Sequence, residues 1–300
     1  MKTLEAGKRI ALNNILFATD FSPHSNSALP YALAIARHYG AKVYGAHVAS
    51  PEDYLFTAPD LWPVQVREQE QLQREVATRL EEQLRGVPHE ALFGTGDVWN
   101  VLSRLIGEHD IDLLVMGTHG RTGARKLLMG SIAEKIFRQA SCPVLSVGPN
   151  VCCKAEGEIR FHHILLATDF GEESLASLPF ALSLAEEEQA QLSLLHVIDE
   201  RTSGVFELEA VKMSTMRRLR KLVPSAAEPW CKVECLVKFN HHLTPPAELI
   251  LETAGQQRAD LIVLGVRPTH GSVTKVTHLA HTTAQHIVAH ATCPVLTVRG

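Results

Sequence analysis

The sequence lacks a strong charge of either sign, a membrane-length apolar run and a regular cysteine framework. Its formal net charge is -4 over 300 residues, so bulk electrostatics give no reason to expect nucleic acid or a membrane as the partner. A hydrophobic share of 45% and a charged share of 21% are typical of a folded globular protein. Six cysteines without regular spacing favour a reducing compartment, the cytoplasm, over a disulfide scaffold.

The opening residues also lack the pattern of a signal peptide. They include basic residues, but Asn13 and Asn14 interrupt the apolar part, and no small-residue cleavage site follows it. We therefore expect this segment to lead into a strand of the folded protein.

An internal duplication is the most informative feature that the sequence does contain. Residues 15–48 align with residues 164–197 at a constant shift of 149, and 15 of the 34 positions are identical. The segments IDLLVMG and CPVLSV recur later as ADLIVLG and CPVLTV. A tandem pair of related units explains this repetition, and we predict two domains, residues 1–150 and 151–300.

Strand-like and helix-like patterns alternate within a unit. Short apolar runs predict strands, whereas apolar residues at helical spacing and the cap-and-proline pair Ser22-Pro23 predict helices. In the first unit the predicted strands are 14–19, 41–48, 89–93, 113–116 and 144–147, and the predicted helices include 66–84, 98–108 and 132–140. This order predicts an α/β fold with two tandem doubly wound, mostly parallel five-stranded sheets and helices on both faces.

A glycine-rich stretch, MGTHGRTGARKLLMGSIAEK, follows the fourth predicted strand. Ligands bind beyond the carboxyl ends of the strands in such sheets. Gly117, Gly120 and Gly130 let the backbone approach a ligand, and Gly130-Ser131 offers free N–H groups at the start of the next helix. The stretch therefore predicts a phosphate cradle, to which Arg121 can add charge. It matches neither the Walker loop nor the dinucleotide-binding G-x-G-x-x-G.

The spacing G-x2-G-x9-G-S in this stretch resembles the universal stress protein family, whose ATP-binding members carry it after strand four. The resemblance extends through ATDFS, GTHGRTG and SCPVLSVGP, and it covers nearly the whole chain twice. It implies a Rossmann-like fold of the adenine nucleotide alpha-hydrolase type. It also implies that the first unit binds an adenine nucleotide, ATP foremost with ADP and AMP left open, and that Mg²⁺ can enter through the phosphates.

The resemblance also assigns roles to individual residues. Asp20 would meet the adenine or ribose, and Val48 would line the adenine pocket. Without the resemblance, Asp20 is equally well explained as a carboxylate that caps the following helix, and Val48 is better explained as core. His119 is either a contact to phosphate or water, or a loop residue facing solvent. The expected cofactor-binding residues are Asp20, Val48, Met116, Gly117, His119, Gly120, Arg121, Gly130, Ser131 and Ile132.

The second unit departs from the motif in the corresponding loop. Pro268 stands where the second glycine would be and contributes no N–H. His281-Thr282 replaces Gly130-Ser131, and the histidine side chain would obstruct a triphosphate. We predict that the second unit keeps the fold but has lost the phosphate site.

Ten of the sixteen histidines lie in the second half of the chain, which raises the question of a metal site. His286 and His290 are four residues apart on a predicted helix, and His278 and His281 come just before it. No Glu or Cys stands in register with them, so solvated or capping histidines are favoured and no metal site is predicted.

The cysteines are expected to be structural. Cys231 and Cys235 alternate with polar residues in a strand pattern, which favours core packing over metal binding. Cys142 and Cys293 recur at equivalent sites before the last strand of each unit. Cys152-Cys153 is the pair expected to be exposed, and nothing in the sequence supports a redox role for it.

No catalytic signature can be assembled from the sequence, and no catalytic residue is predicted. The family resemblance implies binding with slow or no hydrolysis, so the protein is interpreted as a nucleotide-responsive stress regulator that acts on an unidentified protein partner. Two alternatives stay open. One is a slow ATPase or other nucleotide-processing enzyme, and the other is an interaction module with a vestigial ligand loop.

The last predicted strand of each unit suggests how the units assemble. Residues 144–147 and 295–298 are apolar, and the family's strand order would place them at sheet edges, where unpaired backbone groups seek a partner. The resemblance implies that such strands pair between units. We therefore expect an internal pseudo-dimer, with further association into a homodimer left open.

Overall fold

The computed structural model describes residues 10–49, 62–119, 130–152, 159–199, 208–225, 231–240, 244–266 and 283–300. Contacts divide the chain into two compact units, one formed mainly by Ala11–Pro149 and the other mainly by Arg160–Gly300. They are called the first and second unit below. Among the described residues, no helix is both long enough and apolar enough to cross a bilayer.

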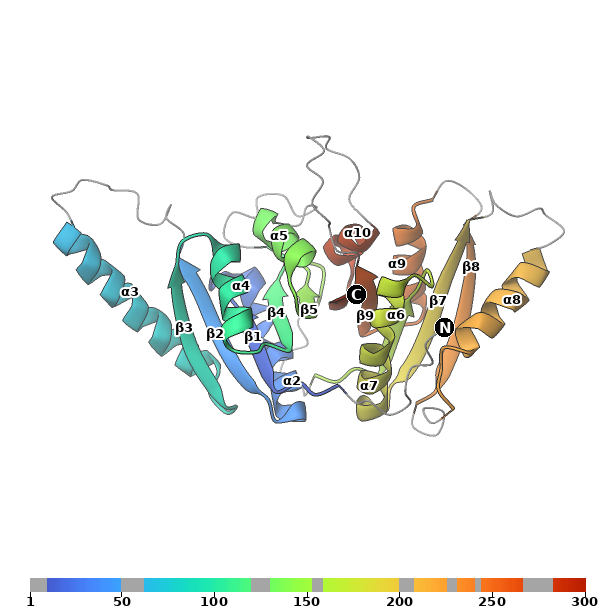
Figure 1. Ribbon diagram of the computed structural model, residues 1–300, viewed down its shortest axis with the longest axis horizontal. Helices are drawn as coiled ribbons and strands as arrows, with labels where there is room; N and C mark the ends of the chain where they lie inside the picture. The colour runs from blue at the N-terminus through green and yellow to red at the C-terminus, as the bar shows by residue number, and fades with distance from the viewer. Residues whose placement is uncertain are drawn as a thin grey trace. The chain divides into compact units, whose positions relative to one another are not determined.

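The first unit alternates strands and helices, as its sequence pattern predicts (Figure 1). Its elements are β1 (Asn14–Ala18), α1 (Pro23–Asn26), α2 (Leu29–Tyr39), β2 (Lys42–Ala49), α3 (Trp62–Gln83), β3 (His89–Thr95), α4 (Val98–Glu108), β4 (Leu113–Gly117), α5 (Ser131–Gln139) and β5 (Val144–Val147).

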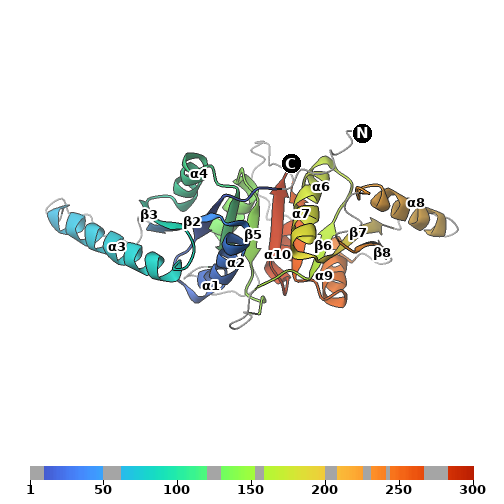
Figure 2. The same cartoon turned by 90° about the horizontal axis from the view of Figure 1, so that it is seen from below.

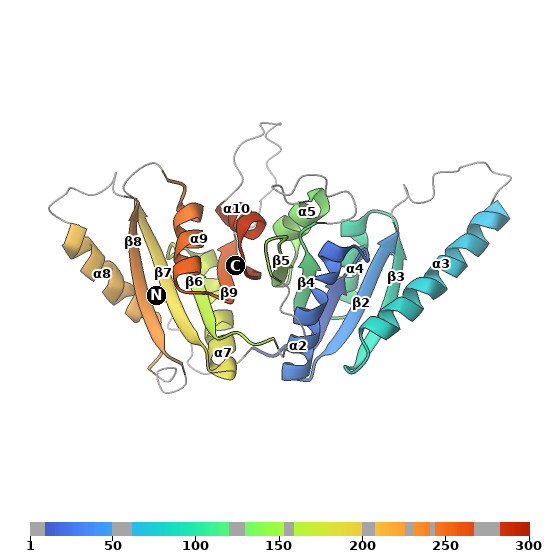
Figure 3. The same cartoon turned by 180° about the vertical axis from the view of Figure 1, so that it is seen from behind.

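The second unit repeats this order. Its elements are β6 (His163–Ala167), α6 (Glu172–Ala176), α7 (Leu178–Glu188), β7 (Gln191–Asp199), α8 (Leu208–Arg220), β8 (Val233–Asn240), α9 (Pro246–Gln256), β9 (Leu261–Val266), α10 (Thr283–His290) and β10 (Val295–Arg299). Figure 3 shows α8 running beside β7 and β8.

The helical segment after β1 is broken into two helices, a detail that the sequence pattern did not predict. Ser22 caps α1 by accepting the N–H of Ser25, with Pro23 in the first turn as expected. Pro30 then stands in the first turn of α2. Because proline has no N–H, it cannot donate to the carbonyl four residues earlier, so α1 ends after four residues and α2 starts anew.

Each unit has a five-stranded parallel sheet. The strand order is β3-β2-β1-β4-β5 in the first unit and β10-β9-β6-β7-β8 in the second, and all pairings within the units are parallel. The predicted α/β, Rossmann-like fold class is thereby confirmed. The order reverses between β1 and β4 and again between β6 and β9, and the carboxyl ends of such strand pairs are where ligands bind in open α/β sheets.

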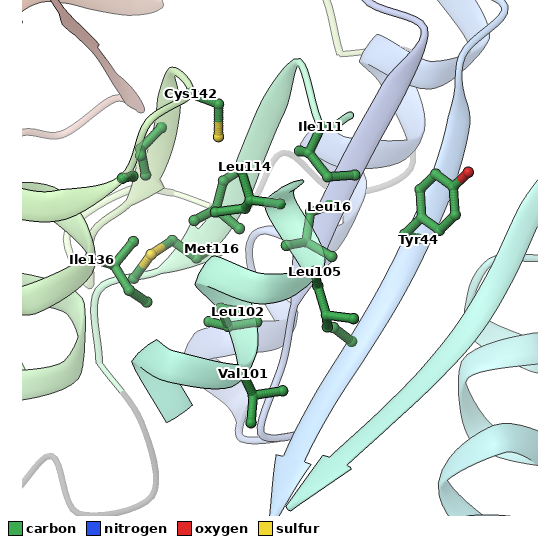
Figure 4. Packing of buried hydrophobic residues seen from close by; sticks show 14 of the residues in the cluster. Leu16, Tyr44, Val101, Leu102, Leu105, Ile111, Leu114, Met116, Ile136 and Cys142 are labelled. Carbon is green, nitrogen blue, oxygen red and sulfur yellow. The ribbon is translucent and has the colours of Figure 1, made fainter. Parts of the chain in front are cut away.

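Helices cover both faces of the first sheet, as Figure 2 shows with α4 on one side of the strands and α1, α2 and α3 on the other. Successive side chains of β2 point to opposite faces of the sheet, so neighbouring residues contact different helices. Tyr44 belongs to the buried cluster that also contains residues of α4 and α5 (Figure 4). A side chain at Gly45 would instead run into Leu80 of α3 and Leu84, which follows this helix directly. The strands are apolar on both faces because both are covered.

Candidate functional site

The candidate site lies at the switch point of the first sheet, the place between β1 and β4 where the strand order reverses. It is beyond the carboxyl ends of these two strands. The ladder continues one residue past each strand, because the N–H of Thr19 donates to the carbonyl of Ala46 and that of Thr118 to the carbonyl of Val147 (both 3.0 Å). Asp20 and His119 therefore follow directly at this edge. The sheet brings together two segments that lie about 100 residues apart in the sequence.

The turn after β1 is held by its own polar side chains. Oδ1 of Asp20 accepts the N–H of Ser22 (2.9 Å), and Oγ1 of Thr19 accepts the N–H of Phe21 (2.9 Å). Phe21 has a φ of 60°, which is rare for a bulky residue. Ser22, and not Asp20, is therefore the N-cap of α1, and Asp20 orders the turn that leads to this cap. Its contact to a nucleotide remains a prediction.

An aromatic stack fixes Phe21 in this unusual conformation. Its ring lies on that of buried His47, with centroids 4.9 Å apart, and the guanidinium of Arg79 from α3 covers it at 4.3 Å. Nδ1 of His47 lies 2.8 Å from the carbonyl oxygen of Thr19, so this nitrogen carries the proton and donates. The sequence did not predict this stack, because its three members come from separate elements.

Gly117 ends β4 where α1 packs against it. A Cβ at this position would lie 2.5 Å from the carbonyl oxygen of His24 and 2.9 Å from the Cα of Ser25. The glycine therefore has a packing role in addition to the predicted approach to a ligand. His119 follows with 6% of its surface exposed, and its Nδ1 lies 2.9 Å from Oγ1 of Thr118. The structure thus contradicts the solvent-facing alternative for His119.

The N-terminus of α5 faces the same edge. Gly130 is the N-cap residue, and its N–H donates to the carbonyl of Thr118 (3.0 Å), which joins the helix start to the end of β4. The Gly130 N–H is consequently engaged by the protein itself. The helix geometry leaves the N–H groups of Ser131, Ile132 and Ala133 without intrahelical acceptors, and the helix dipole adds positive potential there.

The surroundings of α5 suit an anion. A Cβ on Gly130 would come within 3.3 Å of the carbonyl oxygen of Thr118, so a larger residue would crowd the helix start. The side chain of Ser131 is exposed, and that of Ile132 is 47% exposed despite being apolar. The backbone donors, the hydroxyl and the small N-cap residue together fit a phosphate group.

The expected adenine side is apolar. Met116 is buried within the cluster of Figure 4, and half-buried Val48 packs against the same cluster from the end of β2. Trp99, in the first turn of α4, packs there as well. The sequence interpretation overlooked Trp99, although an aromatic residue one turn into a helix at the carboxyl edge could have signalled it.

An ion pair connects α4 and α5 close to the N-termini of both helices. Nζ of Lys135 lies 3.2 and 3.3 Å from the two carboxylate oxygens of Asp97, which also caps α4 by accepting the N–H of Asn100 (2.9 Å). The Asn100 N–H and then Lys135 lower the pKa of Asp97. The pair is exposed, so its main effect is to orient α5 and not to stabilise the fold.

Some expected residues lie outside the described ones. Gly120 and Arg121 belong to this group in the first unit, as do Pro268 and His281 in the second. Their roles therefore remain predictions from the sequence. The structure does bring Gly117, His119, Gly130 and Ser131 to one edge, and it places Asp20 and Val48 at the ends of neighbouring strands on that edge.

The second unit contains the same turn after β6. Oδ1 of Asp169 accepts the N–H of Gly171 (2.8 Å), and Phe170 has a φ of 64°. The ring of Phe170 lies tilted by 45° against that of His196, with centroids 4.6 Å apart, and is covered by the guanidinium of Arg218 at 3.9 Å. The turn and its stack are thus duplicated features of the fold.

The histidines of α10 are engaged within the protein. Nε2 of His286 lies 2.9 Å from Oε1 of Glu248, and its ring stacks on that of His290 at 4.2 Å. Nδ1 of His290 donates to the carbonyl of His286 (2.9 Å). Within the described part of the chain, which excludes His278 and His281, no group of three or more His, Cys, Asp or Glu could hold a metal ion.

The described cysteines are free thiols, and most of them are packed. Cys142, Cys231 and Cys293 are buried, and Cys235 is half-buried, as expected for core residues. Burial raises the pKa of Cys142 to about 12, so its thiol is inert at neutral pH. Cys152 is exposed as predicted, and Cys153 lies outside the described residues.

Comparison with known proteins identifies relatives for both units. A model described as "Universal stress protein family" matches residues 12–148 and 160–299. A universal stress protein of Thermus aquaticus is 35% identical over 135 residues, which is 44% of this chain and 96% of that protein. One from Methanocaldococcus jannaschii is 31% identical over 137 residues, 44% of this chain and 80% of that protein.

A solved structure extends the likeness over both units. The crystal structure of a universal stress protein from Archaeoglobus fulgidus matches with a TM-score of 0.70 at 20% identity, over 97% of this chain and 99% of that one. This likeness concerns the fold.

Proposed function

The chain belongs to the universal stress protein family, and from that membership we propose that its first unit binds one adenine nucleotide, ATP foremost, as a regulator in a stress response. The observation that carries the proposal is the junction at the switch point. There the N–H of Gly130 meets the carbonyl of Thr118 (3.0 Å), so the glycine ending β4 and the Gly130-Ser131 start of α5 form one edge.

The phosphates would lie at the start of α5. The N–H groups of Ser131, Ile132 and Ala133 and the hydroxyl of Ser131 would donate to phosphate oxygens, and the helix dipole would offset part of their charge. The adenine would contact the apolar side at Val48, Met116 and Trp99. Mg²⁺ would be bound through the phosphates. This arrangement is one of binding, and we assign hydrolysis at most a slow rate.

A protein partner would bind differently to the nucleotide-bound and the nucleotide-free protein. A ligand that binds one conformation of the first unit better than another shifts the population toward that conformation. The surface around α4 and α5 would change with it, because the Asp97–Lys135 pair connects these two helices.

Titration calorimetry with ATP tests the proposal, together with mass spectrometry of small molecules released from the purified, denatured protein. We expect about one ATP per chain, because the second unit replaces the phosphate-binding glycines. Absence of ATP binding by the folded protein would refute the proposal, and two equivalent sites would refute the assignment to the first unit alone.

A further inference from the structure

One position at the candidate site differs in charge between the two units. The duplication places Glu173 at the position of His24 and Glu172 at that of Pro23, at the shift of 149. The structure supports this equivalence, because a glycine within the last two residues of the neighbouring strand, Gly117 in β4 and Gly265 in β9, abuts the same backbone in each unit. A Cβ on Gly117 would crowd the carbonyl oxygen of His24, and one on Gly265 would overlap that of Glu173.

A series of contacts links His24 to the start of α5. The N–H of Gly130 donates to the carbonyl of Thr118 (3.0 Å), and Oγ1 of Thr118 lies 2.9 Å from Nδ1 of His119. The His119 ring lies beside that of His24, with centroids 5.9 Å apart. The half-buried imidazole of His24 is therefore connected, through His119 and Thr118, to the helix start at which the phosphates are proposed to bind, although it comes from a different part of the chain.

The two side chains have opposite chemistry toward an anion. Imidazole can donate an N–H group to a phosphate oxygen, whereas an ionised carboxylate only accepts and is negative. In the second unit, Glu172 and Glu173 lie in the first turn of α6, and carboxylate oxygens of Asp169 and Glu173 lie 3.0 and 3.4 Å from the place that a Cβ on Gly171 would take. These carboxylates already supply negative charge to that helix N-terminus.

We propose that residue 24 and its counterpart set the charge selectivity of the two sites. His24 favours a phosphate-bearing ligand in the first unit, and Glu173 disfavours one in the second. The inference rests on the proposed function, since it concerns the same nucleotide site. It identifies a reason for the difference between the units that does not depend on the glycine-rich loop.

The test compares a charged and an uncharged probe, ATP and adenosine, on the full chain. The carboxylate introduced by His24→Glu should weaken ATP binding by about tenfold or more while changing adenosine affinity by less than about twofold, because only ATP carries phosphates that the new carboxylate would repel. His24→Lys places a positive charge and N–H donors at this position and should bind ATP at least as tightly as the wild type. Glu173→Gln is the matched variant in the second unit. It should leave the ATP affinity of the first unit unchanged and should strengthen any binding of ATP to the second unit.

The outcomes separate this inference from the proposed function. Unchanged ATP affinity in folded His24→Glu, an equal loss of ATP and adenosine, or ATP binding by His24→Lys tenfold weaker than by the wild type would each overturn the role of His24. A wild-type protein that binds neither probe would overturn the proposed nucleotide function itself, and the charge selectivity with it.

Discussion

The turn after the first strand of each unit is built from the same parts, whereas the ends of the neighbouring helices are not. Phe21 and Phe170 share a positive φ, a histidine beneath the ring and an arginine above it. A glycine at or next to the end of the fourth strand packs against the first helix of the unit in both cases. Because these features recur around different loops, they serve the fold.

The differences concentrate where a ligand would bind. His24 is replaced by Glu173, and the pair Lys135–Asp97 between α4 and α5 is replaced by His286–Glu248 between α9 and α10. A duplicated chain thus contains its own control. Shared residues indicate what the fold requires, and divergent residues indicate what the ligand requires.

Substitution of the strand-end glycines should have the largest effect, and it should be alike in both units. Gly117→Ala and Gly265→Ala each place a Cβ against helix backbone, which cannot move aside as a flexible side chain can. We expect each to lower the free energy of unfolding by about 3 kcal/mol, measured by denaturant titration. A fully stable Gly117→Ala variant would show that this glycine serves the ligand and not the fold.

Substitution of Gly130 should weaken ligand binding strongly while changing the stability of the fold little. In Gly130→His, which imports the residue expected in the second unit, the ring would occupy the phosphate position at the start of α5. ATP affinity should fall about 100-fold, since two charge-assisted hydrogen bonds or more are lost. The nucleotide-free protein should lose less than about 1 kcal/mol, because a small shift relieves the 3.3 Å contact between the new Cβ and the carbonyl oxygen of Thr118. Calorimetry and thermal unfolding measure the two quantities, and unchanged ATP affinity would remove Gly130 from the site.

The aromatic stacks should contribute equally to both units. Arg79→Ala and Arg218→Ala each remove a guanidinium from an aromatic face at the protein surface, with an expected loss of about 0.5–1 kcal/mol. Denaturant unfolding of the two variants measures the difference. A much larger effect in one unit would mean that the stack had acquired a separate role there.

Mild acid should affect the two units in opposite directions, by a small amount. Burial lowers the pKa of His196 below its usual 6.5, so its contribution is present at higher pH and is lost as the pH falls through 6.5 toward the folded value. The Val87 carbonyl and Glu81 raise the pKa of His89, so its contribution is present below 6.5 and is lost as the pH rises through the folded value.

Unfolding at pH 7.5 and about pH 5.5 tests this contrast. His196→Gln should reduce the loss of stability on acidification, and His89→Gln should increase it. If both variants respond to acid as the wild type does, the contrast does not arise from these two histidines.

The sequence by itself determined the duplication, the α/β fold and most element limits. The predicted helix 98–108 and strand 144–147 coincide with α4 and β5, because apolar periodicity reflects which face of a helix or strand is buried. The sequence also located the glycine spacing near the end of β4. These signals depend on residues close together in the sequence, so they can be recognised without the tertiary contacts.

The tertiary structure alone decided which distant residues meet. It buried His119 beside His24, placed Arg79 over Phe21 and packed Gly117 against α1. No periodicity encodes such contacts, since they depend on the order of strands in the sheet and on the elements packed at its carboxyl edge. For the same reason the difference between His24 and Glu173 acquires chemical meaning only once the switch point brings the ends of β1 and β4 together.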